Sequence, residues 1–158
     1  YTILRPTAFM ESWCAPIGAQ VLSGERVTIY GNGKNSISFV SAADVAKCIV
    51  LALEDPRLRN QTLTIGGAQS LTFEDVAAVY ERLSHKRVGR RYAPAWLLKL
   101  SSRLYQPFDE AQARFMAIRH ELATANWRVD MNEVVRQYPI VLMCLEEVAR
   151  QRIGDMGT

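Results

Sequence analysis

The 158-residue sequence predicts an α/β protein in which parallel strands alternate with crossover helices. Three observations predict this class. Short runs of β-branched and apolar residues alternate with stretches of helical periodicity, Ser or Thr with Asp three positions later precedes two of those stretches, and glycine or proline closes most runs. Hydrophobic residues make up 49% of the chain and charged residues 22%, which excludes a disordered tail or a disulfide-dense miniprotein.

The chain begins with residues typical of a strand. Tyr1-Thr2-Ile3-Leu4 is a run of aromatic, β-branched and apolar residues that Pro6 ends. Residues 9–22 are expected to form a loop leading into a short helix, interrupted where Pro16 and Gly18 fall inside it. Because the chain opens inside a strand, we expect a preceding portion of the same fold.

A hairpin is predicted next. Residues 27–30 and 37–40 are both rich in β-branched and apolar residues, and Gly31-Asn32-Gly33 between them is typical of a turn. We therefore expect the two segments to pair with each other.

The alternation of helix and strand then continues. Residues 41–55 are expected to form a strongly apolar helix, residues 61–65 a strand closed by Gly66-Gly67, and residues 72–83 a second helix. Capping-box patterns begin both helices, with Ser41 and Asp44 in the first and Thr72 and Asp75 in the second. This order predicts parallel strands joined by helices, at least through Leu83.

The second half of the chain is predicted to be mostly helical, a cap on the α/β part. Helices are expected at residues 94–106, 109–122, 130–138 and 142–153, where prolines and acidic residues mark the boundaries.

A basic stretch runs from residue 82 to residue 103. No acidic residue lies between Glu81 and Asp109. The basic residues there are Arg82, Lys86, Arg87, Arg90, Arg91, Lys99 and Arg103. Such a stretch attracts phosphates, RNA or an anionic membrane surface, but it lacks the aromatic interleaving of a nucleic-acid platform. We interpret it as a solvated face or the rim of an anionic-ligand pocket, and expect no nucleic-acid partner.

Two motif-like spacings are rejected. Tyr30 and Lys34 have the Tyr-x-x-x-Lys spacing of a catalytic acid and its activating Lys, but the glycines between them specify a turn, not the helix that this chemistry needs. Gly31-x-Gly33 begins a dinucleotide fingerprint, yet an extended segment follows where a helix N-terminus is required. Gly66-Gly67 lacks the third glycine and is interpreted as a strand-to-loop turn.

No metal site, disulfide framework or membrane span is predicted. Three cysteines, Cys14, Cys48 and Cys144, are far apart, and so are the two histidines, His85 and His120. This pattern favours a reducing, cytoplasmic setting. Asp44 is interpreted as a helix N-terminal residue that interacts with the dipole, in preference to a catalytic carboxylate.

Three strings in this order resemble the atypical and extended short-chain dehydrogenase/reductases, particularly the NmrA-like group. These strings are Tyr1 to Pro6 followed by Phe9-Met10-Glu11 and Trp13, then Ile37 to Ala46, then Gln61 to Gly66 with Leu71 to Asp75. In the helical part, Pro94 to Leu97 and Asn126-Trp127 are similar to relatives that include an accessory subunit of respiratory complex I.

The resemblance implies the last strands of a doubly wound, Rossmann-type parallel sheet with a helical substrate-side cap, and NAD or NADP as the cofactor of the full-length protein. In such proteins the loop after the first strand of this chain lies at the nicotinamide end of the cofactor. The matching positions for cofactor binding are Pro6, Thr7, Ala8, Phe9 and Met10. Phe9 and Trp13 are the substrate-pocket candidates. The alternative, that these two side chains only cover the hydrophobic core, stays open.

The family's glycine-rich turn, its NAD/NADP-selecting residue and its Tyr-x-x-x-Lys helix all precede the strand with which this chain begins. We therefore expect a C-terminal portion: residues 1–83 from the NAD(P)-binding domain and residues 84–158 as the cap. No catalytic residue is assigned within it, and the chain alone is expected to be inactive and unable to hold a dinucleotide.

Three functions remain open at this point. The leading one is an oxidoreductase-type or epimerase-type protein to which this chain contributes the nicotinamide and substrate pocket. The second is a non-catalytic NmrA-like redox sensor or assembly factor. The third is a small module that binds an anionic partner through residues 82–103.

Overall fold

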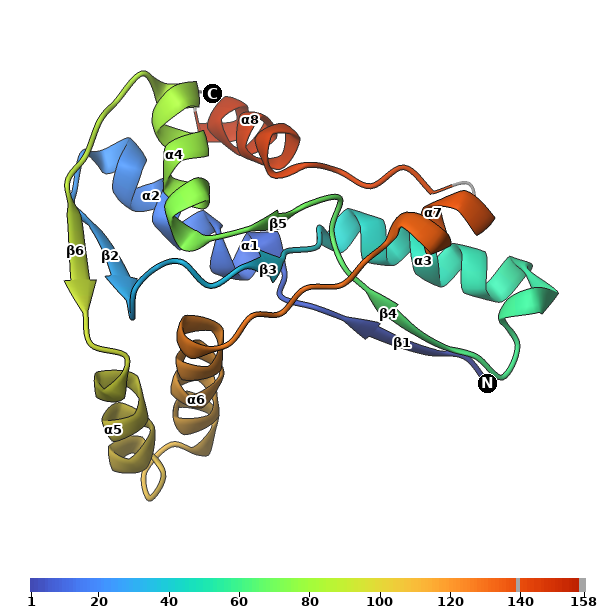
Figure 1. Ribbon diagram of the computed structural model, residues 1–158, viewed down its shortest axis with the longest axis horizontal. Coiled ribbons are helices and arrows are strands. Elements are labelled where there is room, and N and C mark those ends of the chain that lie inside the picture. Colours follow the sequence, from blue (N-terminus) through green and yellow to red (C-terminus); the bar gives the residue numbers. More distant parts are fainter. Residues whose placement is uncertain (139, 157–158) are drawn as a thin grey trace.

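The structure is a computed structural model that describes residues 1–138 and 140–156 (Figure 1). Within these residues the strands form three separate two-stranded pairs, surrounded by helices. The α/β class predicted from the sequence is confirmed, and each pair has its own place in the fold.

The first pair is parallel. Strand β1 (Ile3–Pro6) lies beside β4 (Thr62–Ile65), with Ile3 opposite Thr62, and helix α3 (Ala42–Glu54) lies between them in the sequence. A short 3-10 turn, Pro56–Leu58, follows α3. Among the described residues β1 has a strand partner on one edge only, and Ile3 beside the other edge is 41% exposed.

The prediction that residues 27–30 and 37–40 pair as a hairpin is wrong. Strand β2 (Val27–Tyr30) pairs in parallel with β6 (Arg90–Ala93), and β3 (Ile37–Ser38) pairs antiparallel with β5 (Ser70–Leu71). The turn itself is confirmed, since Gly31 and Gly33 both have positive φ angles.

Strands β2 and β3 do not pair because both edges of β3 already form hydrogen bonds with other segments. The Trp127 amide donates to the Ser36 carbonyl at 2.9 Å, and the Ser38 amide donates to the Trp127 carbonyl at 2.8 Å. With Trp127 on one side and β5 on the other, β3 has no free edge for β2.

Helices α1 (Met10–Trp13) and α2 (Ala15–Ser23) form the predicted interrupted helix, which breaks at Cys14 just before Pro16. Helix α4 (Phe73–Ser84) begins with the predicted capping box, because Thr72 and Asp75 exchange hydrogen bonds in both directions. It packs on α2, where Gly18 lets the Tyr80 ring approach closely. Helix α8 (Leu145–Met156) packs on the other side of α4.

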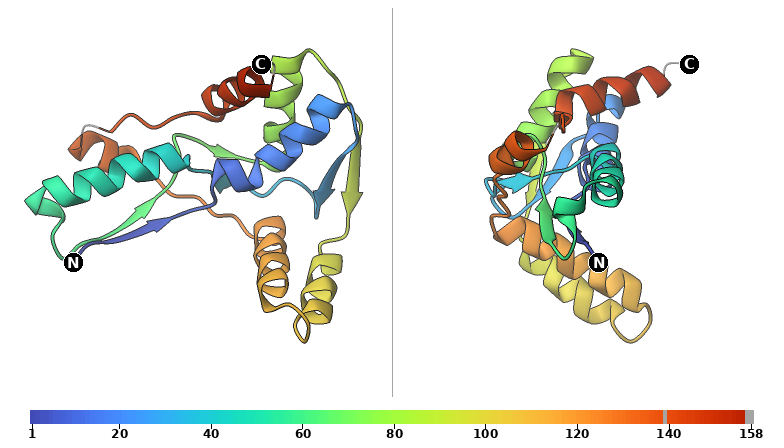
Figure 2. Two further views of the ribbon diagram at one scale, coloured as in Figure 1. Left: turned by 180° about the vertical axis from the view of Figure 1, so that it is seen from behind. Right: turned by 90° about the vertical axis from the view of Figure 1, so that its right-hand side faces the viewer.

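The remaining helices all lie in the second half of the chain, in the part that the sequence analysis predicts to be a cap. Helices α5 (Trp96–Tyr105) and α6 (Glu110–Thr124) form a hairpin, and α7 (Asn132–Gln137) lies near α3 (Figure 1). Figure 2 shows that the molecule curves when seen from the side, with the α5–α6 hairpin at one end. No helix within the described residues is both long and apolar enough to cross a bilayer.

Two hydrophobic cores result. The larger one lies between α2, α4, α8 and strands β2 and β3, and the smaller one lies under α3 and α7. The segment that joins them is the loop after β1, because Ala8 and Met10 belong to the larger core and Phe9 packs against the smaller one.

Candidate site at the carboxyl ends of β1 and β4

The loop that follows β1 crosses the carboxyl ends of the parallel pair. The Thr7 amide donates to the Ile65 carbonyl at 2.9 Å, and the Thr7 hydroxyl donates to the Ser38 carbonyl. The Val40 amide then donates to the Ala8 carbonyl at 3.0 Å. Ligands of open α/β sheets bind beyond this edge, and the cofactor contact expected at this loop stays a prediction.

The five residues expected to contact the cofactor differ in exposure. Pro6 is exposed, and Thr7 and Phe9 are partly exposed. Ala8 and Met10 are buried in the core, at 9% and 1% exposure. Within this part of the chain, therefore, the side chains of Pro6, Thr7 and Phe9 and the backbone of the loop are the groups open to a ligand.

Trp13 lies one helical turn beyond the loop and stacks on the cap. Its ring centroid is 5.3 Å from that of Phe115 on α6, and the two planes differ by 17°. The Arg119 guanidinium lies 4.9 Å from the centre of the Tyr30 ring and 5.8 Å from that of Phe115. The guanidinium thus lies against two aromatic rings, one of which stacks on Trp13.

These side chains line a cavity of about 90 Å³. Its wall comes from both halves of the chain, with Trp13, Tyr30 and Phe73 on the body and Phe115 and Arg119 on the cap. No acidic residue lines it. The cavity is mostly apolar, with room for about one ring and with one fixed positive charge.

Sequence reasoning identified Trp13 but missed Phe115, Arg119 and Tyr30 as its neighbours. Phe115, Arg119 and Ala123 follow one another at four-residue spacing, so helical periodicity places them on one face of α6. Nothing in the sequence says that this face meets Trp13, because the contact depends on how the α5–α6 hairpin packs.

A larger cavity, of about 550 Å³, lies between the β4–β5 connection and α7. It is lined by residues 67–70, 128–132 and 140–142 together with Val135. It contains none of the predicted site residues and is more open than the Trp13 cavity.

A pyrophosphate site needs a glycine-rich turn that leads into a helix N-terminus, and the chain has two glycine pairs that could form such a turn. Gly31 and Gly33 lead into β3, and Gly66 and Gly67 lead into β5, so neither pair precedes a helix N-terminus. Gly67 instead lies so close to β3 that an added Cβ would be 1.7 Å from the Phe39 carbonyl oxygen. The described residues therefore fit the nicotinamide end of the cofactor, with a cradling loop and apolar rings, and not its phosphates.

Asp44 lies in the first turn of α3, as expected, but the capping box predicted for it with Ser41 is wrong, because its carboxylate bonds groups other than the Ser41 amide. Its carboxylate is fully buried in the first turn of α3, accepts a hydrogen bond from the Met143 amide at 2.7 Å, and pairs with Lys47 Nζ at 2.8 Å. Ser41 caps the helix through the Ala43 amide.

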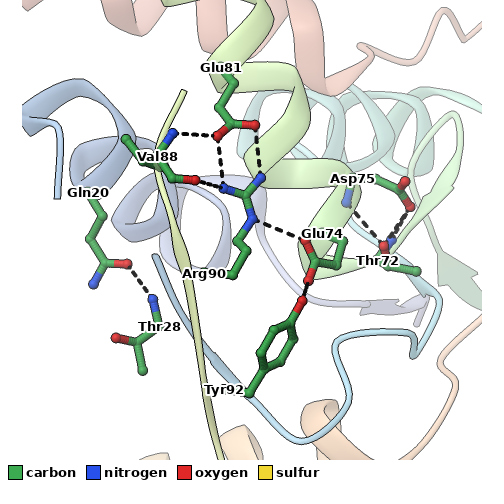
Figure 3. A network of polar contacts seen from close by, with 9 residues as sticks. All are labelled: Gln20, Thr28, Thr72, Glu74, Asp75, Glu81, Val88, Arg90 and Tyr92. Carbon is green, nitrogen blue, oxygen red and sulfur yellow. Dashed lines mark hydrogen bonds and ion pairs between the residues drawn. The ribbon is translucent and has the colours of Figure 1, made fainter. Parts of the chain in front are cut away.

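Part of the basic stretch is neutralised inside the molecule (Figure 3). Both guanidinium NH groups of Arg90 donate to the Glu81 carboxylate at 2.9 Å, and its Nε donates to Glu74 at 3.1 Å. These hydrogen bonds hold the pKa of Glu81 below its ordinary value, while Glu74 raises the pKa of Tyr92 by accepting from its hydroxyl. Strand β6, which sequence reasoning missed, is attached to α4 through this network.

Two of the thiols, those of Cys14 and Cys48, are buried and not activated. Burial raises the pKa of Cys14, and the Glu11 carboxylate adds to this effect. Burial also raises the pKa of Cys48. Thiols that are buried and neutral are poor nucleophiles.

The chain is similar to part of one family model and to part of several known proteins. Residues 4–66 match the model of the NAD dependent epimerase/dehydratase family. The chain is 35% identical over 124 residues to agroclavine dehydrogenase of Claviceps fusiformis, covering 70% of this chain and 39% of that protein. It is 24% identical over 112 residues to the photosystem II assembly factor Ycf39 of Trieres chinensis, covering 71% and 35%.

The fold agrees with these relatives. The NADPH-dependent quinone oxidoreductase QOR2 of Escherichia coli, solved in complex with NADPH, superimposes with a TM-score of 0.75 at 18% identity, covering 97% of this chain and 53% of that one. The chain thus spans less than half the length of the two curated relatives named above and about half of this solved structure. Residues 4–66 are thus similar to the NAD dependent epimerase/dehydratase family, and the fold is that of NAD(P)-binding Rossmann-type proteins.

Proposed function

We propose that this chain supplies the nicotinamide-facing and substrate-facing part of an NAD(P)-dependent oxidoreductase. The observation that carries the proposal is the continuity of the site: the loop across the carboxyl ends of β1 and β4 runs directly into α1, whose Trp13 lines a cavity closed by the cap. A cofactor ring against the loop and an acceptor against Trp13 would then be neighbours.

In this proposal residues 1–83 complete the cofactor-binding domain and residues 84–158 form the substrate-side cap. NAD(P)H supplies the hydride. The residues of this chain have supporting roles: the backbone of the loop and the side chains of Pro6, Thr7 and Phe9 position the nicotinamide ring, while Trp13 orients the acceptor and excludes water. The acid/base group is assigned to a part of the fold that these residues do not include.

The test uses the full-length protein, NADH or NADPH, and a panel of quinone and enone acceptors, with oxidation followed at the nicotinamide absorbance band. Trp13→Ala should lower kcat/KM for the acceptor by about fivefold, since aromatic stacking is worth roughly 1 kcal/mol. The KM for NAD(P)H should stay unchanged.

Trp96→Ala, which removes an exposed Trp from α5, is the matched control and should leave both constants unchanged. Equal effects of the two substitutions would contradict the assignment of Trp13. Binding of NAD(P)H without turnover of any acceptor would contradict the oxidoreductase proposal and favour the redox sensor or assembly factor.

A further inference from the structure

The Trp13 cavity combines aromatic walls with a cation that has no anionic partner. Arg119 reaches the cavity from α6, and its guanidinium lies over the rings of Tyr30 and Phe115 at 4.9 and 5.8 Å. A cation–π contact leaves the N–H groups of the guanidinium free to donate hydrogen bonds. Within the described residues, these N–H groups have no hydrogen-bond acceptor and no ion-pair partner. Arg119 can therefore bind an anionic group of a ligand.

The carboxylates on the helices around the cavity have neighbours elsewhere. Helices α1, α4 and α6 carry six acidic residues, and none of them lines the cavity. Their neighbours are Ser41 for Glu11, Arg90 for Glu74 and Glu81, Thr72 for Asp75, Arg114 for Glu110, and His120, at 3.9 Å, for Glu121. The charge of Arg119 is thus not offset at the cavity wall.

A second cation adjoins the cavity from β6. Thr28 lines the cavity and is opposite Arg91 in the β2–β6 pair, and the Arg91 guanidinium donates to the Thr28 hydroxyl at 3.2 Å. Side chains alternate along a strand, so Arg90 points to the other face of the pair, where Glu74 and Glu81 bind it (Figure 3). The face that carries the cavity therefore keeps its positive charge, while the opposite face is neutralised.

These features select a ligand by its chemistry. The volume of about 90 Å³ admits about one ring and excludes a nucleotide, and aromatic walls favour a ring that is itself aromatic. The planar guanidinium matches a carboxylate, which accepts two parallel N–H···O hydrogen bonds from it. A cationic ligand would be repelled.

We propose that the Trp13 cavity binds an aromatic carboxylate, with its ring against the aromatic wall and its carboxylate on the Arg119 guanidinium. The inference rests on the proposed function, because it names the chemical class of the acceptor for the same site. Arg119 is a binding residue here: it fixes the position of the ligand and takes no part in the transfer of the hydride.

The test is isothermal titration calorimetry of the full-length protein with benzoate, benzamide and cyclohexanecarboxylate at neutral pH, where the carboxylates are ionised. Benzoate should bind at least about tenfold more tightly than benzamide, which has nearly the same shape and no charge, because hydrogen bonds between charged groups are the stronger ones. It should bind about fivefold more tightly than cyclohexanecarboxylate, which has the charge and lacks the aromatic ring.

Substitutions locate the binding. Arg119→Gln should remove the preference for benzoate over benzamide, and Arg119→Lys, which keeps the charge but not the planar fork, should retain part of it. Arg114→Gln is the matched control, because Arg114 lies on the same helix, its side chain is 74% exposed, and it does not line the cavity. It should bind like the unaltered protein, and circular dichroism should show that every variant is folded. Equal affinities for benzoate and benzamide, or the same loss in Arg114→Gln as in Arg119→Gln, would overturn the proposal.

Calorimetry needs no turnover, so the ligand class and the proposed function fail separately. Benzoate binding that depends on Arg119 supports the ligand class even when no acceptor oxidises NAD(P)H, and that result counts against the oxidoreductase function alone. Turnover of a neutral quinone, without any preference for benzoate over benzamide, supports the function and overturns the ligand class.

Discussion

Arg90 shows at the scale of one residue how this fold uses its charges. Its guanidinium connects strand β6 to helix α4 through Glu81 and Glu74, and its side chain is only 18% exposed. A partly buried guanidinium with several charged acceptors contributes more than an ordinary surface ion pair, because water screens it less.

Arg90→Ala should therefore lower the free energy of unfolding by about 2 kcal/mol at neutral pH, the range for hydrogen bonds to charged groups. Because Arg90 holds the pKa of Glu81 below its ordinary value of 4.5, this contribution is complete above about pH 4.5 and is lost as the pH falls through the lowered pKa. Urea denaturation at neutral and acid pH should show the difference between the two proteins shrinking on acidification.

The neighbouring substitution Arg91→Ala is the control. The Arg91 guanidinium is exposed and donates to the Thr28 hydroxyl at 3.2 Å, so its loss should change stability by less than about 0.5 kcal/mol at either pH. A deficit in Arg90→Ala that stays constant down to pH 3 would contradict the role assigned to Glu81.

At the scale of an element, the junction between β4 and β3 depends on a glycine. The Cβ of any other residue at position 67 would clash with the Phe39 carbonyl. The backbone must move for a side chain to fit there, and a rigid β3 held by both Trp127 and β5 resists that movement.

Gly67→Ala should lower the free energy of unfolding by about 3 kcal/mol, the upper part of the range for overpacking. Gly154→Ala on α8 meets no atom within 4 Å and should be neutral or slightly stabilising, because alanine favours a helix. Thermal unfolding of both variants measures this difference. Equal melting temperatures would contradict the prediction, because they would show that the backbone beside position 67 moves at little cost.

The elements also show what the sequence can and cannot predict. The helices were predicted well, because capping residues such as Thr72 and Asp75 act within a few residues of the backbone they satisfy. Strand pairing was predicted poorly, because β2 meets β6 across more than 60 residues and β6 consists of Arg90-Arg91-Tyr92-Ala93, which has no apolar pattern. Phe115 and Arg119 were not predicted as neighbours of Trp13 for the same reason, because they come from a helix about 100 residues away in the sequence.

At the scale of the whole molecule, the outer edge of β1 and the adjoining face of α3 are open. Tyr1 and Leu53 are more than 80% exposed there, and Ile49 is about half exposed. An unpaired strand edge beside exposed apolar side chains is a template for further pairing.

Residues 1–158 expressed alone should therefore form concentration-dependent oligomers and bind a hydrophobic dye. Ile49→Lys with Leu53→Lys should reduce both effects, whereas Ala43→Lys, at an exposed position of α3 outside the stripe of Ile49 and Leu53, should not. Sedimentation velocity and dye fluorescence measure this, and a monomeric chain with a sharp two-state melt would contradict it.

The Trp13 cavity is lined by residues from two parts of the molecule. Trp13, Tyr30 and Phe73 come from the body of the molecule, while Phe115 and Arg119 come from the projecting hairpin. A change in the position of the hairpin must therefore change the shape of the cavity. Thermodynamic linkage makes such coupling reciprocal: if a ligand in the cavity favours one position of the hairpin, then whatever holds the hairpin in that position raises the affinity of the cavity for that ligand to the same extent.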